Sequence, residues 1–231
     1  MTALSRHREP EIMDSPRLDA ARHRRALDAL GRINLLSRSA AQLWTDIRSI
    51  DHRGRPLRIL DLACGGGDVA IALQRRATRS GVPVEVSGCD ASELAVARAQ
   101  QRAAAVGAEV RFFRRDVLRE PLPADLDVAC STLFLHHLDD VDAVLLLEKM
   151  VTAARRMVVV QDLERSRTGW LLAYLGVRML SRSDVAWVDG PRSVRAAYTA
   201  NEALALARRA GIEARARRCW PFRFNLVWQA S

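Results

Sequence analysis

Residues 57–68 read LRILDLACGGGD and decide how the rest of the chain is interpreted. An apolar run enters a cluster of three glycines, and a helix-compatible run from Val69 to Arg76 follows. This order is typical of a buried parallel strand, a tight turn and a crossover helix. Glycines at such a turn allow the backbone to approach a ligand closely. The stretch therefore predicts an α/β fold with a ligand site after this strand.

Two cofactors fit the spacing of the glycines, and charge separates them. Gly65, Gly67 and Ala70 match the G-x-G-x-x-G/A pattern of dinucleotide-binding folds. However, Asp61 ends the strand and Asp68 opens the helix, so two carboxylates would repel a pyrophosphate at the helix N-terminus. S-adenosylmethionine (SAM) instead carries a sulfonium and an ammonium group. The acidic turn therefore favours SAM over NAD.

Composition and charge narrow the class of protein. The chain has 231 residues, of which 49% are hydrophobic and 27% charged, and this fits one α/β domain with additions. Because no apolar run is long enough for a bilayer and the charged N-terminus lacks a signal-peptide core, we expect a cytoplasmic protein. The four cysteines have no metal-ligand spacing, which predicts reduced, buried thiols and no metal site. The net charge is +9, but the arginines run through every segment, which argues against nucleic acid as the partner. The oligomeric state is left open.

Apolar periodicity predicts the order of the elements. Amphipathic helices at 17–37 and 40–50 precede the first strand, and we expect them either to cap the pocket or to form a packing layer on the sheet. From residue 57 onward the regular alternation predicts a doubly wound, mostly parallel seven-stranded sheet of the Rossmann-like type. Strands are expected at 57–61, 84–89, 110–113, 127–131, 157–160, 214–220 and 225–229, and later helices at 92–106, 139–154 and 201–210. The strand at 157–160 is the most apolar and is expected to be central.

We divide the chain at residue 55. Residues 1–55 are predicted to hold an N-terminal arm and a helical cap, the arm being poorly ordered up to about residue 16. Residues 56–231 are predicted to form the ligand-binding domain. Within this domain, residues 163–200 break the alternation and are expected to build an acceptor pocket.

Acidic residues follow three consecutive strands, at Asp61, Asp90 and Asp116. In a doubly wound sheet, ligands lie beyond the carboxyl ends of the strands. Asp90 could accept hydrogen bonds from both ribose hydroxyls of the cofactor, and Asp116 could accept one from its adenine amino group. Each carboxylate alone could equally be a helix cap or a surface residue.

With these residues in place, the chain resembles the class I SAM-dependent methyltransferases over about residues 57–162, most closely in LDLACGGG at 60–67. Ala63 stands where that family usually has glycine. The resemblance implies that the glycine turn cradles the methionine part, that Asp90 holds the ribose, and that other residues meet the adenine and the sulfonium. The implied cofactor-binding residues are Asp61, Ala63, Gly65, Gly67, Asp90, Ala91, Asp116, Val117, Ser131 and Leu133.

The segment 131–138 resembles the small-molecule methyltransferases of quinone and polyketide biosynthesis. Asn34, Ser37 and Trp44 also resemble the N-terminal segment of the ubiquinone and menaquinone type. The resemblance implies methyl transfer to a small apolar acceptor, namely a phenolic, polyketide or quinone-like oxygen or ring carbon. An RNA methyltransferase and a non-catalytic SAM-binding protein remain as alternatives.

Methyl transfer from a sulfonium is an in-line displacement, so alignment contributes most and a base helps when the acceptor is a hydroxyl. His136 and His137 are both candidates for the base, because histidine titrates near neutral pH. The resemblance implies that His136, the first of the two, is nearer the cofactor, and it is the predicted base. The alternative is that His136 packs on the sheet or caps the following helix. Four aromatic residues late in the chain are predicted to line the acceptor pocket, where flat rings suit an apolar wall; they are Trp170, Tyr174, Trp187 and Tyr198.

Overall fold

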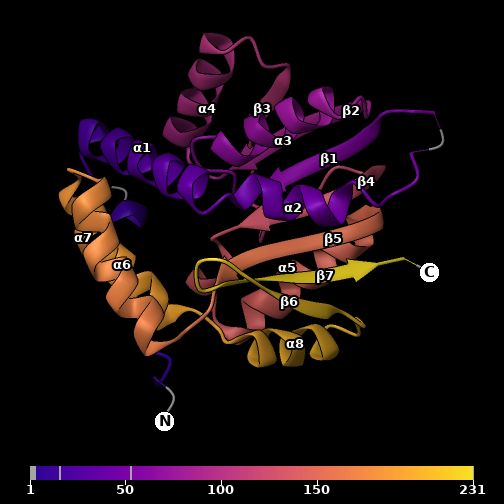
Figure 1. The fold of residues 1–231 in the computed structure, drawn as a ribbon. Coiled ribbons are helices and arrows are strands. Elements are labelled where there is room, and N and C mark those ends of the chain that lie inside the picture. The colour runs from indigo at the N-terminus through magenta and orange to yellow at the C-terminus, as the bar shows by residue number, and fades with distance from the viewer. Residues whose placement is uncertain (1–3, 16, 53, 231) are drawn as a thin grey trace.

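The structure is a computed structural model that describes residues 4–15, 17–52 and 54–230. Its strands are β1 (Leu57–Leu62), β2 (Val84–Asp90), β3 (Val110–Arg114), β4 (Leu126–Thr132), β5 (Ala154–Leu163), β6 (Arg215–Cys219) and β7 (Arg223–Gln229). They form one sheet in the order β3-β2-β1-β4-β5-β7-β6 (Figure 1). Strands β1 to β5 pair in parallel, whereas β7 pairs antiparallel with both β5 and β6. The predicted doubly wound, mostly parallel seven-stranded sheet is confirmed.

Helices cover both faces of this sheet. One face carries α2 (Ser39–Ile47), α3 (Asp68–Arg79) and α4 (Glu93–Ala105), and the other carries α5 (Asp140–Ala153) and α8 (Ala200–Arg209) (Figure 1). Successive residues of a strand point to opposite faces, so Ile59 lies in the first core and Leu60 in the second. Each layer of helices thus has its own apolar core.

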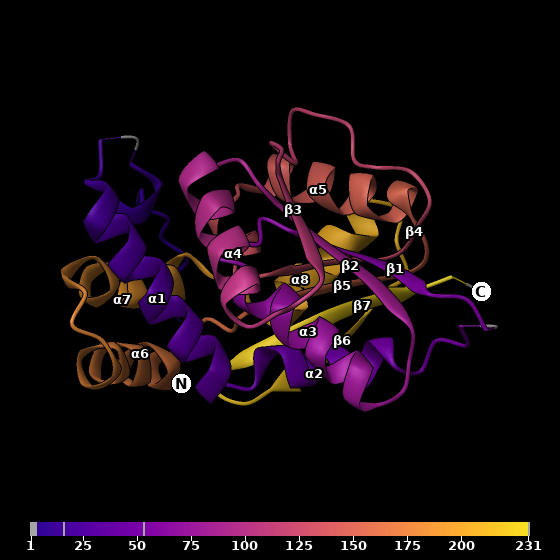
Figure 2. The ribbon, with the colours of Figure 1, turned by 90° about the horizontal axis from the view of Figure 1, so that it is seen from above.

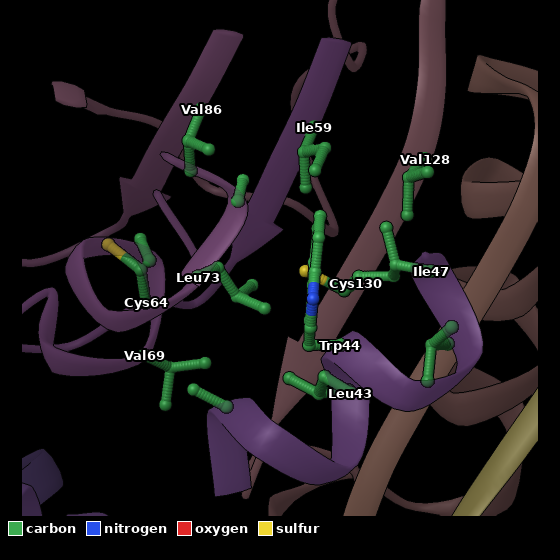
Figure 3. Packing of buried hydrophobic residues seen from close by; sticks show 14 of the residues in the cluster. Leu43, Trp44, Ile47, Ile59, Cys64, Val69, Leu73, Val86, Val128 and Cys130 are labelled. Carbon is green, nitrogen blue, oxygen red and sulfur yellow. The ribbon is translucent and has the colours of Figure 1, made fainter. Parts of the chain in front are cut away.

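The helix α2 is a packing layer on the sheet. Its side chains Leu43, Trp44 and Ile47 are buried and lie against Ile59 of β1 and Val128 of β4 (Figure 3). Burying a side chain of this size contributes about 1.5–3 kcal/mol. The contribution of α2 is therefore to stability.

A cap of three helices lies beyond the carboxyl ends of the parallel strands (Figure 1, Figure 2). It consists of α1 (Ala20–Leu36), α6 (Arg167–Leu180) and α7 (Asp184–Ala196), which contact one another. Of the two predicted N-terminal helices, one therefore belongs to the cap and the other packs on the sheet. Two short 3₁₀ helices, η1 (Ile12–Asp14) and η2 (Leu135–His137), lie against α7.

Residues 4–15 are not the poorly ordered arm that the sequence predicts. The amides of Ile12 and Met13 donate to the two carboxylate oxygens of Asp189, at 2.9 and 3.0 Å. Asp189 is buried in α7, and nothing local in the sequence indicates this long-range contact. The prediction is therefore wrong for the described part of the arm. Residues 1–3 and 16 lie outside the described residues.

Several boundaries differ from the prediction, two of them for reasons that the structure identifies. The first long helix begins at Ala20 because the Asp19 carboxylate caps it, accepting hydrogen bonds from the amides of Ala21 and Arg22. Strand β5 is longer than 157–160 because it pairs with β7 as far as Leu163. It is an interior strand, but β4 holds the middle position of the sheet. Across the described ranges, none of the helices combines the length and the apolarity that crossing a membrane requires.

Candidate active site

A cavity of about 850 Å³ lies between the carboxyl ends of the strands and the cap. Pockets for cofactors and drug-sized ligands have about this volume. The sheet side contributes polar residues from the turns after β1 and β2, and the cap side contributes mainly apolar residues. Representative members are Asp61, Gly65, Asp90 and Asp116 on the sheet side, and Leu30, Ile33, Leu172 and Val177 on the cap side.

The glycine turn after β1 is closely packed. Gly67 has φ +73°, and a Cβ added there would lie 2.7 Å from both Ala99 Cβ and Phe112 Cζ. Only glycine fits this backbone and this space. Gly67 is absent from the residues that line the cavity, so it acts by letting the turn pack on α4 and β3. Gly65 does line the cavity, as does Ala63, whose φ of +51° explains why glycine suits that position.

Asp90 joins the turns after β1 and β2. Its Oδ2 accepts a hydrogen bond from the Gly65 amide at 2.9 Å, and its Oδ1 accepts one from the Ser92 amide at 2.9 Å. Burial raises the pKa of Asp90 despite these two bonds. Each carboxylate oxygen retains a further lone pair for a ligand hydroxyl. Ala91, the next residue, also lines the cavity.

Asp61 and Asp68 make the turn strongly acidic. Asp61 is 1% exposed, and burial, followed by repulsion from Asp68, raises its pKa well above the ordinary value. Asp68 accepts a hydrogen bond from Asn34 Nδ2 at 3.0 Å, and burial raises its pKa as well. Carboxylates held together in this way are stabilised by a cationic ligand, because an opposite charge favours their ionised form.

The ends of β3 and β4 complete the sheet side. Asp116 lines the cavity together with Val117, and its Oδ1 accepts a hydrogen bond from the Leu118 amide at 3.0 Å. Thr132 also lines it, and its buried hydroxyl has no hydrogen-bond partner among the described residues. Leu133 follows, with φ +57°. Ser131, in contrast, is fully buried and donates to the Leu62 carbonyl at 3.0 Å, which turns it away from the cavity.

His136 lines the cavity from η2 and is 3% exposed. Its Nδ1 lies 2.7 Å from Asp162 Oδ1, and its amide donates to Asp162 Oδ2 at 2.8 Å. Its Nε2 lies 3.5 Å from Glu11 Oε1. Burial alone would lower the pKa of His136, but Asp162 and Glu11 outweigh it and raise the pKa to about 10. Since the charged imidazole has no free lone pair, His136 could act as a base only after losing this proton. Its catalytic role stays a prediction.

The four aromatic residues predicted to bind the acceptor do not line the cavity, although all four lie in the described part of the chain. Trp170 and Tyr174 stack on each other one helical turn apart, with ring centroids 5.5 Å apart. The cavity is instead met by another face of α6, through Leu172, Ala173, Gly176, Val177 and Leu180.

The other two aromatic side chains have structural partners. Trp187 Nε1 donates to the Ser181 carbonyl at 2.7 Å. The hydroxyl of Tyr198 lies 3.0 Å from Asp140 Oδ1, and its ring belongs to the core under α5 and α8. Composition places aromatic residues in this segment, but it does not indicate which helix face turns inward.

Sequence reasoning missed several charged residues of the cavity, among them Arg223 and Glu11. Arg223 is 2% exposed, and its Nη1 donates to Asn34 Oδ1 at 3.2 Å. Burial lowers the pKa of Arg223 to about 10. Its signal in the sequence was an arginine at the start of a mostly apolar strand. Glu11 carries no comparable signal, because its contacts with η2 come only from the tertiary fold.

One known protein family matches the part of the chain that builds most of the sheet side of the cavity. Residues 59–156, from β1 to the beginning of β5, match the model of a family described as a methyltransferase domain. This match covers less than half of the chain, and it shows that residues 59–156 are similar to a methyltransferase domain. The fold built around them is the Rossmann-like fold of solved methyltransferase structures.

Individual proteins resemble parts of the chain. Demethylmenaquinone methyltransferase of Thermus thermophilus is 46% identical over 68 residues, which are 29% of each chain. Ubiquinone biosynthesis O-methyltransferase of Pseudomonas aeruginosa is 26% identical over 158 residues, covering 68% of this chain and 64% of the relative. The chain thus spans less than two thirds of the length of these curated relatives. The crystal structure of a SAM-dependent methyltransferase from Aquifex aeolicus has a TM-score of 0.64 at 17% identity, and the match covers 93% of this chain and 100% of that one. At this identity, the structural likeness shows the fold.

Proposed function

We propose that the protein is a SAM-dependent methyltransferase acting on a small apolar acceptor, such as a phenolic, polyketide or quinone-like oxygen or ring carbon. The observation that carries this proposal is the arrangement of the cavity. Carboxylates from the ends of successive strands, including Asp61 and Asp90, meet one side of it, and apolar cap residues form the other. The names of the curated relatives, which refer to demethylmenaquinone and ubiquinone, support a small acceptor of this kind.

The residues of the sheet side fit SAM by charge. Asp61 and Asp68 are suited to its ammonium group, and Arg223 is suited to its carboxylate. Asp90 retains acceptor capacity for the ribose hydroxyls beside the Gly65 amide. The resemblance assigns the adenine to Asp116 and Val117, both of which line the cavity. When bound, SAM supplies a methyl group on a positively charged sulfur.

The contribution of the chain is mainly to align the two reactants and to exclude water. The apolar faces of α1 and α6 enclose the remaining part of the cavity. Holding two reactants in line can supply several kcal/mol of the barrier reduction, up to about 7–11 kcal/mol in favourable intramolecular systems. A flat, apolar acceptor is the class of molecule that such walls would hold.

The proposal is tested by calorimetry with SAM, followed by transfer of a labelled methyl group to a panel of phenols, quinols and structured RNA. We expect saturable SAM binding and label in one or more of the small acceptors. SAM binding without transfer to any acceptor would favour the non-catalytic alternative, and label in RNA would favour the RNA methyltransferase. Absence of SAM binding would refute the cofactor assignment.

We also propose a cytoplasmic location. It is supported by the four free cysteines of the described chain, three of which are buried and one, Cys219, half-buried. Expression with a compartment-specific biotin-labelling partner would test the location directly.

A further inference from the structure

Three potential metal ligands from two distant segments meet at the wall of the cavity. Glu11 comes from the N-terminal segment, and His136 and His137 come from η2 after β4. Their ligand atoms lie within 4.8 Å of one another, and all three residues line the cavity. The predicted use of His136 as a base does not account for the second histidine or for the carboxylate between the two rings.

Each imidazole is oriented by a carboxylate of its own. His136 Nδ1 lies 2.7 Å from Asp162 Oδ1, and His137 Nδ1 lies 2.9 Å from Asp14 Oδ2. A carboxylate at Nδ1 fixes the proton on that nitrogen and raises the basicity of the other one, as it does for the histidine ligands of metal sites. When the rings are neutral, the two Nε2 atoms therefore carry the lone pairs that a metal ion could bind.

The two Nε2 atoms face the same carboxylate. His136 Nε2 lies 3.5 Å from Glu11 Oε1, and His137 Nε2 lies 3.8 Å from Glu11 Oε2. These separations exceed the 2.7–3.2 Å of an ordinary N–H···O hydrogen bond. They are closer to the roughly 3.3 Å between neighbouring ligand atoms in a tetrahedral zinc site with bonds of about 2.0–2.1 Å. Ser193 Oγ donates to Glu11 Oε1 and so holds the carboxylate in place.

We propose that Glu11, His136 and His137 form a binding site for a divalent first-row transition-metal ion, with zinc as the best match. Two imidazole nitrogens and one carboxylate oxygen are the donor set of zinc sites that keep one position open. Because the three residues line the cavity, the open position faces the space where an acceptor would lie. Water or an oxygen of a small molecule would complete the coordination.

The rival explanation is an ion pair between protonated His136 and the carboxylate of Glu11. This proton satisfies the contact with one oxygen of Glu11, and no metal is then needed. The two explanations differ in what the purified protein does with a metal ion in the absence of SAM, so the outcome is independent of the proposed methyl transfer.

The test uses the full chain after treatment with a chelator and dialysis. Co²⁺ is titrated while its visible absorption is recorded, since tetrahedral Co²⁺ absorbs strongly, and Zn²⁺ is then added to displace it. We expect one Co²⁺ per chain, a tetrahedral spectrum and full displacement by Zn²⁺. Thermal unfolding of each metal-free variant shows that the fold is intact.

The variants locate the site. Glu11→Gln and His137→Gln keep the size and hydrogen bonding of the side chains, and each should weaken Zn²⁺ binding more than about 100-fold. Asp14→Asn, which removes an outer partner, should weaken it roughly 10- to 100-fold. His7→Gln is the control, because His7 lies on the same segment but pairs with Glu9, and it should leave the affinity unchanged. Absence of saturable Co²⁺ binding, or unchanged affinity in both Glu11→Gln and His137→Gln, would overturn the proposal in favour of the ion pair or of an adventitious site.

Discussion

Replacing Asp61 by asparagine should stabilise the protein without cofactor and weaken its binding of SAM. Asp61 is 1% exposed, and burial together with the charge of Asp68 raises its pKa. When the pKa of an acidic group is higher in the folded state than in the unfolded state, the folded protein loses stability as the pH rises. For Asp61 this loss begins near the unfolded pKa of 3.8 and continues up to the folded pKa. Above its unfolded pKa, Asp61 therefore opposes folding, and asparagine removes this penalty while keeping the shape.

The expected sizes follow from the same contacts. Because the folded pKa of Asp61 exceeds the unfolded one, the free energy of unfolding of Asp61→Asn should exceed that of the wild type at pH 7. Losing a charged partner of the SAM ammonium group costs about 1.5–3 kcal/mol, which is roughly 10- to 150-fold in dissociation constant.

Asp127 provides a matched control on the neighbouring strand. It is also 1% exposed, but it does not line the cavity, and it accepts hydrogen bonds from Arg55 and from the Arg58 amide. Burial would raise the pKa of Asp127, but these bonds outweigh burial and lower it. Its contribution to stability is therefore present above its unfolded pKa and is lost as the pH falls through its folded one. Asp127→Asn should destabilise the protein by about 1–3 kcal/mol and leave SAM affinity unchanged.

The assay is urea unfolding of the three proteins without cofactor between pH 5 and pH 8, with calorimetry of SAM binding at pH 7. The stability difference between Asp61→Asn and the wild type should grow with pH. If Asp61→Asn destabilises the protein as Asp127→Asn does, and SAM affinity is unchanged, the account of an acidic cation site at this turn is refuted.

Three further predictions concern the turn and the charge of the chain. Gly67→Ala should lower the free energy of unfolding by about 2–5 kcal/mol in urea unfolding, because the new Cβ would overlap α4 and β3 at positive φ. Gly81→Ala is the control: Gly81 has φ +68° but open space around it, so the substitution should cost only about 1 kcal/mol. Ala63→Gly should leave the melting temperature equal or higher, since it relieves a left-handed alanine at φ +51°, and a clear fall would contradict that reading. If the arginine excess is a general bias of composition, RNA binding measured by filter retention should be weak, lack sequence preference and decline steeply with salt; tight, sequence-selective binding at physiological salt would reverse the choice of acceptor.

The parallel half of the fold could be predicted because its signals are local. The apolar run, glycines and acid of 57–68 lie within one strand and one turn, and Asp90 and Asp116 follow the next two strands at the same edge. Parallel pairing brings such residues together without any knowledge of side-chain packing. These three aspartates therefore line one cavity.

The cap could not be predicted to the same depth because its contacts are tertiary. Trp170 and Tyr174 lie in the expected segment, but the direction of α6 turns Leu172 and Val177 toward the cavity instead. In the same way, a histidine after β4 is visible in the sequence, while its approach to Glu11 depends on the N-terminal segment returning to α7. Periodicity indicates that a helix has an inner face, but it does not identify the partner of that face.

The cap has a consequence for how such a protein can diversify. Its helices come from residues 20–36 and 167–196, on either side of the continuous stretch that matches the methyltransferase domain family. Under the proposed function, most of the donor-binding side comes from this one uninterrupted stretch, with Arg223 added from β7, whereas the walls around the acceptor come from the two pieces of chain that flank it. If the proposed function holds, insertions, exchanges or rapid substitution in these pieces can change the acceptor while the residues of the central stretch that hold the methyl donor stay the same. Ancestry traced through the central block therefore carries information about the donor, and the flanks need to be compared separately to follow the acceptor.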